Sequence, residues 1–155
     1  MFVERFKILW KGCVAQSATA AVVMFLILLL ISMEHVLVVA AIGASAFIVF
    51  AMPSSNTARS KNIIGGHTIS LVVGSFCAII PEPCLCCSLA AQSLAVGLAI
   101  VIMALLNVGH PPAAATALGV SMCGFSVSVA ITIITSSVCL ALAHHFLRPF
   151  MRDIV

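Results

Sequence analysis

Two consecutive prolines, Pro111 and Pro112, interrupt an almost unbroken apolar sequence and limit how the chain can fold more than any other feature. Neither residue has a backbone N–H, and a backbone group left unpaired in hydrocarbon costs several kcal/mol. Because proline suits the first position of a helix, we expect a helix to begin here and to run through residues 113–120. The break before it, which includes His110, then has to be buried in protein or face water.

The composition places this break in a lipid bilayer. Hydrophobic residues make up 63% of the 155 residues and charged residues 7%, and the mean hydropathy is +1.30. Soluble domains have about 45–50% apolar and about 25% charged residues. Since one crossing needs about 20 apolar residues, the chain has room for about five or six crossings and for no soluble domain. We therefore predict an all-α polytopic membrane protein with a single transmembrane domain over residues 1–155 and no nucleic-acid partner.

The positions of the lysines and arginines predict the topology. All seven lie before the first apolar segment, between residues 53 and 62, or after the last segment. Positive charge favours the cytoplasmic side, so we expect both termini in the cytoplasm. This orientation requires six crossings, one of them through the weakly apolar stretch 109–123, with a turn at residues 33–35. The expected segments are 13–32, 36–52, 65–80, 85–106, 109–123 and 125–146.

The second segment of each half carries a similar run of small residues. Residues 43–49 and 113–119 each follow a helix breaker and contain one hydroxyl side chain, Ser45 and Thr116 respectively. With three crossings in each half, the two halves have opposite orientations. This pattern predicts a 3+3 inverted repeat of residues 13–80 and 85–147 with two interrupted (half) helices, the arrangement that marks midplane binding sites in transporters. A chance likeness of two short runs is the alternative.

Several motifs follow one another in a specific order: Gly43-Ala44-Ser45-Ala46, the loop 53–62, Gly65-Gly66-His67, and His110-Pro111-Pro112 with Ala115-Thr116-Ala117. Together they resemble the HPP family of small integral membrane proteins, which is named after its His-Pro-Pro motif. The resemblance implies a transporter of bacteria or plastids, with nitrite as the substrate suggested for plastid relatives, and hence the bacterial inner (cytoplasmic) membrane. Family members often have two glycines after the prolines, where this sequence has Ala113 and Ala114.

Helix N-termini offer a way to hold an anion in the membrane. Each carries about half a positive charge and unpaired N–H groups. If helices begin near Gly43 and Pro111 and enter from opposite faces, their positive ends converge near the midplane, where backbone N–H groups and two hydroxyls hold the ion. We predict a transporter or channel for a small monovalent inorganic anion such as nitrite. The expected substrate-binding residues are Gly43, Ala44, Ser45, His110, Pro111, Pro112 and Thr116.

Further polar residues are expected along the pathway or at its cytoplasmic mouth, namely Asn62, His67, Asn107, Arg59 and Lys61. For the two basic residues the alternative is snorkelling at the membrane interface. For His110, a hydrogen bond or proton exchange with the anion competes with capping of a carbonyl that the prolines release. The sequence does not separate a channel from a carrier, or an ion from its neutral acid.

Other function classes find less support in the sequence. The predicted segments contain no nucleophile–base pair, carboxylate dyad or metal-ligand set, so we expect neither an enzyme nor a metal or other cofactor. Three of the seven cysteines, Cys84, Cys86 and Cys87, lie together but lack the paired spacing of a structural zinc site. The main competitor is a non-transporting membrane assembly subunit. A face of small residues at positions 91, 95 and 99 predicts packing against another helix or, in a homo-oligomer, another copy of the chain.

Overall fold

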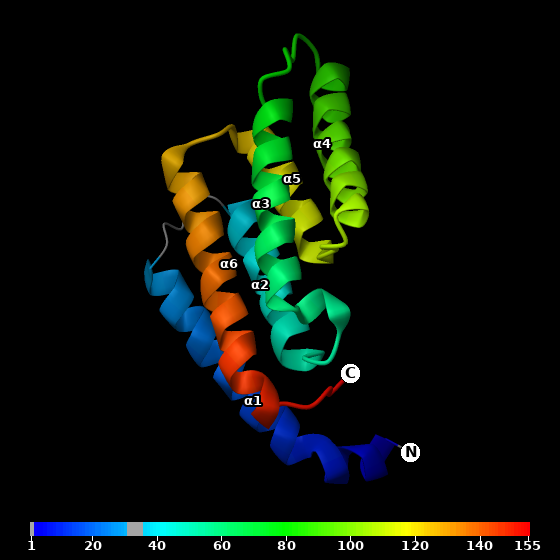
Figure 1. The fold of residues 1–155 in the computed structure, drawn as a ribbon, viewed down its shortest axis with the longest axis vertical. Coiled ribbons are helices and arrows are strands. Elements are labelled where there is room, and N and C mark those ends of the chain that lie inside the picture. Colours follow the sequence, from blue (N-terminus) through cyan, green and yellow to red (C-terminus); the bar gives the residue numbers. More distant parts are fainter. Residues whose placement is uncertain (1, 31–35) are drawn as a thin grey trace.

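Helices make up most of the chain that the computed structural model describes, residues 2–30 and 36–155 (Figure 1). Two single 3-10 turns, η1 (Asn56–Ala58) and η2 (Arg148–Phe150), accompany six α-helices within these ranges. The α-helices are α1 (Phe2–Leu30), α2 (Val36–Ala51), α3 (Ser60–Cys77), α4 (Leu85–Leu105), α5 (Pro111–Cys123) and α6 (Val127–Leu147). The predicted all-α polytopic fold is confirmed, whereas the turn expected at residues 33–35 lies outside the described residues.

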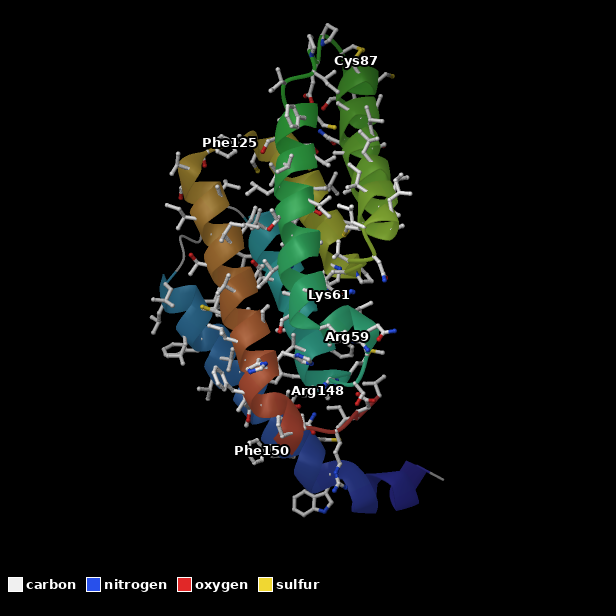
Figure 2. The ribbon with its side chains drawn as sticks, viewed as in Figure 1. Arg59, Lys61, Cys87, Phe125, Arg148 and Phe150 are labelled. Carbon is white, nitrogen blue, oxygen red and sulfur yellow. The ribbon has the colours of Figure 1, made fainter. Side chains whose placement is uncertain are left out.

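Successive helices run in alternating directions along the bundle, so the two termini lie at the same end (Figure 1). The loop after α2 also lies there, and Arg59, Lys61 and Arg148 gather toward this end (Figure 2). Cys87 and Phe125 lie at the opposite end. The arrangement agrees with six crossings and with the predicted clustering of positive charge. Which end faces the cytoplasm stays a prediction.

Among the described residues, three helices are long and apolar enough to cross a bilayer by themselves: Gly12–Leu30 within α1, Leu85–Leu105, and Val127–Phe150, with mean hydropathies of 2.3, 2.2 and 1.9. Large apolar side chains on α1 and α4, such as Leu29 and Leu89, are more than half exposed, as expected of surfaces that face lipid. The protein is therefore an integral membrane protein. By contrast, α2 with 16 residues and α5 with 13 are about 24 and 20 Å long, short of the hydrocarbon thickness of about 30 Å.

The two short helices begin differently. α5 begins at Pro111, as the sequence predicts, and His110 is its N-cap. The helix expected to begin near Gly43 begins instead at Val36 and continues through Gly43 to Ala51. A glycine inside a helix costs only about 1 kcal/mol relative to alanine, which is less than leaving backbone groups unpaired in hydrocarbon. The positive end of α2 is therefore about 10 Å from Gly43 along the helix axis.

α2 and α5 pack against each other in opposite directions. A Cβ placed on Gly119, near the end of α5, would lie 3.1 Å from Cβ of Leu37 at the start of α2. At the other end of the contact, Ser45 of α2 lies beside His110. An inverted repeat requires such an antiparallel pair, although the repeat itself stays a prediction.

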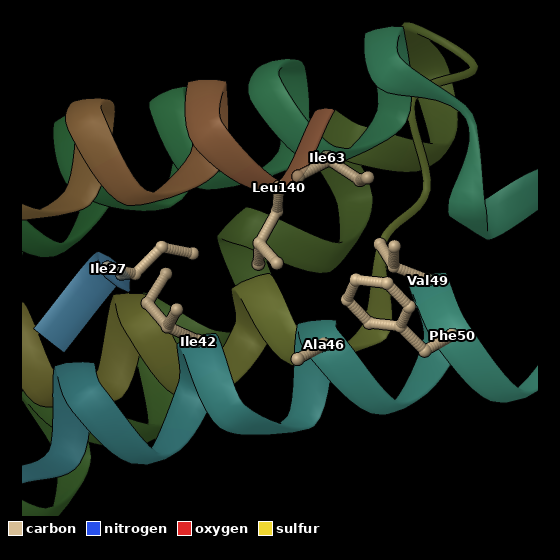
Figure 3. Close-up of a cluster of buried hydrophobic side chains, with 7 residues drawn as sticks. All are labelled: Ile27, Ile42, Ala46, Val49, Phe50, Ile63 and Leu140. Carbon is tan, nitrogen blue, oxygen red and sulfur yellow. The ribbon is translucent and has the colours of Figure 1, made fainter. Parts of the chain in front are cut away.

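Apolar contacts tie α1, α2, α3 and α6 together in one cluster (Figure 3). Its buried members are Ile27, Ile42, Ala46, Val49, Phe50, Ile63 and Leu140. The chain end is attached to the same region, because Gln16 on α1 donates to the carbonyls of Phe50 and Arg152. The small-residue face of α4 packs inside the molecule: Ala95 and Ala99 lie in a second cluster with residues of α3 and α5. This face therefore packs against helices of the same chain. Contact with a second copy in a homo-oligomer would require a different surface.

Glycines bring α3 and α5 into close contact. A Cβ on Gly74 would lie 2.7 Å from the carbonyl oxygen of Ala117 and 2.8 Å from Cβ of Val120. Gly66, two turns earlier on α3, meets His110 and Ala113 in the same way. Because backbone atoms stand opposite Gly74, no rotamer change can make room for a larger residue there.

We expect Gly74→Ala to lower the free energy of unfolding in detergent by about 1 to 3 kcal/mol, because the added methyl group forces α3 away from α5. Gly97→Ala on α4 is the matched control, since a Cβ there meets nothing within 4 Å. The control should leave stability unchanged or raise it by up to about 1 kcal/mol. Unfolding followed by circular dichroism measures both variants, and equal stabilities would contradict the close packing of α3 on α5.

Candidate functional site

Four polar side chains form a continuous buried chain inside the apolar bundle. Ser45 lies on α2, His67 on α3, His110 at the N-cap of α5 and Thr116 within α5, and none of them is more than 1% exposed. Ser45 Oγ lies 2.9 Å from Nε2 of His67 and 2.9 Å from Nε2 of His110. On the far side of its ring, His67 Nδ1 lies 2.9 Å from Thr116 Oγ1. We call these four residues the polar centre.

The polar centre ends at the loop that follows α2. The Nδ1–H of His110 donates to the backbone carbonyl of Thr57 at 2.9 Å. Thr57 belongs to η1, which is held by its N-cap Ser55, whose hydroxyl accepts from the Thr57 N–H. The structure therefore joins three motifs that are far apart in the sequence: the small-residue run of α2, the loop 53–62 and the His-Pro-Pro break.

Two glycines on α3 allow the break to come this close. A Cβ on Gly66 would lie 2.8 Å from Cβ of His110, and a Cβ on Gly65 would lie 3.2 Å from Cβ of Val108. Both distances are shorter than the optimal carbon–carbon separation of about 3.5–4.0 Å. His67 follows directly, so the Gly65-Gly66-His67 motif seats the break against α3 and places a histidine in the centre.

Side chains at the start of α3 satisfy the carbonyl groups that the break releases. Asn62 Nδ2 donates to the carbonyl of Gly109 at 3.0 Å, and Lys61 Nζ donates to that of Asn107 at 3.3 Å. Asn107, whose φ is +53°, is where the chain turns away from α4. Asn62 is 6% exposed, and its Oδ1 has no hydrogen-bond partner. One buried acceptor beside the break is therefore unsatisfied.

Of the two positions expected for His67, along the pathway or at its cytoplasmic mouth, the structure does not support the mouth. The helix was expected to start at about Gly65, but α3 begins at Ser60, so His67 is two turns inside the helix and fully buried. Asn62 is buried too, whereas Arg59, Lys61 and Asn107 are exposed. Only these three occupy positions that fit a mouth. Snorkelling remains open as the role of the two basic residues.

Gly43 and Ala44 lie away from the polar centre. Gly43 lines a different pocket, between α1 and α2, and Ala44 is exposed. Since neighbouring residues of a helix point about 100° apart, Ser45 can face α3 and α5 while Gly43 faces α1. Of the expected binding residues in α2, the structure brings only Ser45 to the centre.

The first turn of α5 lacks the free N–H groups that were expected to hold an anion. Pro111 and Pro112 have no N–H, and the N–H of Ala113 donates to the His110 carbonyl at 2.9 Å. The two hydroxyls expected at the site, those of Ser45 and Thr116, already contact histidine nitrogens. The helix therefore supplies a positive potential, and the polar donors of the site are side chains.

A pocket of about 400 Å³ reaches the polar centre from outside. It lies between α4, η1 and the start of α5, and its walls are Thr57, Ile100, Met103, Ala104, Gly109, His110, Pro111 and Ala114. Figure 1 shows that α5 begins partway along the bundle, short of the end reached by α1 and α6. His110 thus belongs both to the wall of this pocket and to the buried hydrogen-bonded chain.

Within the described residues, no three histidine, cysteine or acidic side chains come together as metal ligands do. The two histidines of the centre have ring centroids 5.2 Å apart and share a hydroxyl group between them. Hydrogen bonding and proton exchange are the chemistry that this arrangement offers.

Sequence reasoning identified Ser45, His110 and Thr116 but missed how they are connected. His67 joins Ser45 to Thr116, which lie on different helices, and the Thr57 carbonyl accepts from a residue 53 positions away. Because every residue has a backbone carbonyl group, the residue type does not show which carbonyl accepts a side-chain hydrogen bond. The glycine pair before His67 was the one usable signal, because adjacent glycines within an apolar segment indicate a close approach of backbones.

Comparison with known proteins agrees with these motifs. The chain matches the family described as HPP, transmembrane region, over residues 3–152. Two transmembrane proteins of Dictyostelium discoideum are similar to it, one 42% identical over 76 residues and one 36% identical over 85 residues. These alignments cover 49% and 55% of this chain and 27% of each relative, so the chain spans about a quarter of their length.

No solved structure matches the chain significantly. The family match nevertheless extends over nearly all of the sequence and includes every residue of the polar centre. This integral membrane protein belongs to the HPP family.

Proposed function

We propose that the protein is a transporter for a small monovalent anion such as nitrite, which binds at His110 and passes through the polar centre. The observation that carries the proposal is that His110 lies both at a pocket and in the buried polar centre. The residue forms part of the wall of the 400 Å³ pocket, and its ring is hydrogen-bonded to Ser45 inside the bundle. A chain of polar side chains in the middle of an apolar bundle has a use in transport and is expensive in a purely structural subunit.

The charge distribution favours an anion over a cation. Glu4, Glu34, Glu82 and Asp153 are the four acidic residues of the chain, so no carboxylate belongs to α2, α3, α4, α5 or α6. Lys61 lies beside the break that forms the pocket, and the positive end of α5 begins at His110. An anion approaching from this end meets positive potential and, in these helices, no acidic side chain.

Two further buried hydroxyl groups could bind the anion after it has passed the polar centre. Ser70 on α3 and Ser136 on α6 are fully buried, and neither Oγ has a hydrogen-bond partner among the described residues. Ser70 is one turn beyond His67. Polar groups left unpaired in a protein interior call for a ligand, a water molecule or a change of conformation. These hydroxyls are available to a small ion that has passed the centre.

The packing around the centre favours a carrier over an open channel. Gly66 and Gly74 hold α3 against α5 so closely that a methyl group does not fit between them. An anion therefore needs α3 and α5 to separate before it can continue past the centre. In this proposal the conformation described is a closed one, and the pocket at His110 is the access from the basic end.

The proposal assigns the polar centre to transport and not to catalysis, and it places the basic end in the cytoplasm of a bacterial inner membrane. The alternative is an assembly subunit in which the hydrogen bonds of the centre only hold the helices together. The two functions differ in one measurable property, which is the movement of anions through a bilayer that contains the purified protein.

Vesicles with the purified protein should take up nitrite faster than protein-free vesicles, and Ser45→Ala should reduce the protein-dependent rate about tenfold or more. The variant loses the hydroxyl that links both histidines, and hydrogen bonds to groups that become charged are among the strongest in proteins. Nitrite uptake is measured colorimetrically after rapid filtration.

Ser75→Ala is the matched control. The hydroxyl groups of Ser45 and Ser75 each lie within hydrogen-bond distance of the carbonyl four residues earlier in their helix, but only that of Ser45 also contacts histidines. The control should transport at the wild-type rate. Wild-type vesicles that move no nitrite, nitrate, formate or chloride would rule out transport and favour the assembly subunit.

A further inference from the structure

The hydrogen bonds of the polar centre allow a single proton order when both histidines are neutral. A carbonyl can only accept, so His110 carries its proton on Nδ1, facing Thr57, and its Nε2 accepts from Ser45. The one hydroxyl proton of Ser45 is then used. His67 must therefore donate from Nε2 to Ser45 Oγ and accept the hydroxyl proton of Thr116 at Nδ1. In all four hydrogen bonds the donor is therefore on the side of Thr116 and the acceptor on the side of Thr57.

The same geometry accepts one additional proton without moving a heavy atom. Ser45 Oγ also lies 3.0 Å from the carbonyl oxygen of Ala41, to which its hydroxyl can donate instead. The two lone pairs of Oγ then accept from Nε2–H of both histidines. His110 becomes an imidazolium ion that donates to Ser45 and to Thr57. The neutral centre and the centre with charge +1 thus differ by one proton on His110 and by the rotation of the Ser45 hydroxyl group.

No carboxylate lies on α2, α3, α4, α5 or α6 to neutralise this charge, and Asp153, which follows α6, accepts the backbone N–H of Ser54. The other ionisable side chains on elements packed against the histidines are Arg59 and Lys61 at the start of α3, Cys77 at its end, Cys86 and Cys87 at the start of α4, Cys123 on α5, and Cys139, His144 and His145 on α6. The buried His144 is engaged with the carbonyl of Pro53. An imidazolium ion without a counter-charge is costly at membrane depth, and so is an anion without a partner. Each is stabilised by the arrival of the other.

We propose that the polar centre takes up one proton with each anion, so that the protein is an electroneutral anion–proton symporter. This inference rests on the proposed transport function and adds the coupled ion. The proton adds to Nε2 of His110, the hydroxyl of Ser45 turns to Ala41, and the anion in the pocket faces the imidazolium ring. Release of the anion on the other side returns the proton to water and restores the neutral order.

Vesicles that contain a pH-sensitive dye report both fluxes in one experiment. A nitrite gradient should acidify the lumen with one proton for each nitrite ion, after subtraction of the neutral-acid leak measured in protein-free vesicles. Clamping the membrane potential with potassium and valinomycin should leave the rate unchanged. Nitrite flux without proton flux, at a rate that follows the potential, would overturn the symport and leave the transport function standing.

His110→Gln tests the role of the histidine charge. Glutamine can donate and accept hydrogen bonds but cannot carry the proton, so we expect coupled uptake to fall about tenfold or more. His145→Gln is the control, because His145 is exposed at the end of α6, where its ring packs against that of Phe146. Equal, proton-coupled uptake by both variants would remove His110 from the mechanism.

The proton order can also be measured without transport. Nitrogen-15 NMR of the histidine-labelled protein should show opposite neutral tautomers, with the proton on Nδ1 of His110 and on Nε2 of His67. Signals are assigned by their loss in the His110→Gln and His67→Gln variants. If both rings carry the proton on the same nitrogen, the proposed order is wrong, whatever the flux experiment shows.

A separate feature lies at the end of the bundle opposite the basic residues (Figure 2). Cys84 is the N-cap of α4, and its sulfur accepts the N–H of Cys87 at 3.4 Å. The two Sγ atoms are 2.9 Å apart, and Cys84 is exposed. The hydrogen bond from the Cys87 thiol lowers the pKa of Cys84 below its ordinary value. Two cysteines separated by two residues at a helix N-terminus are a known arrangement of reactive dithiols.

We infer that Cys84 and Cys87 form a reversible dithiol–disulfide pair that reacts with low-molecular-weight disulfides. The Cys84 thiolate attacks one sulfur of the small disulfide and releases the other as a thiol after protonation. Cys87 then loses its proton, attacks Sγ of Cys84 in the mixed disulfide, and releases the second thiol. The protein pair is oxidised by two electrons, and the small disulfide is reduced to two thiols.

Treatment with oxidised glutathione in detergent, followed by denaturation and alkylation, tests this pair by intact mass. The wild type should alkylate two fewer than its seven cysteines and retain no glutathione. Cys86→Ser should also lose two alkylation sites, because its change leaves the pair intact, whereas Cys87→Ser should retain one glutathione on Cys84. Full alkylation of the treated wild type, or a stable glutathione adduct on it, would contradict the inference.

Discussion

In hydrocarbon each polar group needs a partner within the protein, and the arrangement of α2, α3 and α5 follows from this requirement. The break before Pro111 releases carbonyl groups at the end of α4, and Asn62 and Lys61 at the start of α3 donate to two of them. His110 in turn needs partners for both ring nitrogens and finds them in Thr57 and Ser45. The elements that carry these hydrogen-bond partners therefore pack together, and their side chains form the polar centre.

Close packing and polar contacts depend on each other in this bundle. Without side chains at Gly65 and Gly66, the break approaches α3 closely enough for the short hydroxyl of Ser45 to reach two histidines. The same closeness excludes any open path between α3 and α5 near Gly74. The four side chains of the polar centre satisfy one another in this conformation, and in the proposed transport cycle some of these contacts are exchanged for contacts with the substrate.

The parts of the fold that depend on local chemistry could be predicted from the sequence. Pro111 specifies a helix start by itself, and the long apolar runs predict the crossings formed by α1, α4 and α6. The uninterrupted course of α2 through Gly43 could not be predicted, because a glycine permits a break without requiring one. The position of His67 depends on where α3 begins, and its contact with Thr116 depends on the packing of residues 49 positions apart.

The two prolines have a consequence for selectivity that the start of a helix alone does not explain. An ordinary helix N-terminus offers free N–H groups that hold an anion directly. At α5 the prolines remove two of these donors and the third is used by the His110 carbonyl, so the positive potential remains while the donors are absent. Under the proposed function, the affinity for an anion then depends on side chains, above all on whether His110 is charged. Such a site would bind the anion strongly when protonated and weakly when neutral, which is the property that a carrier needs in order to release what it has bound.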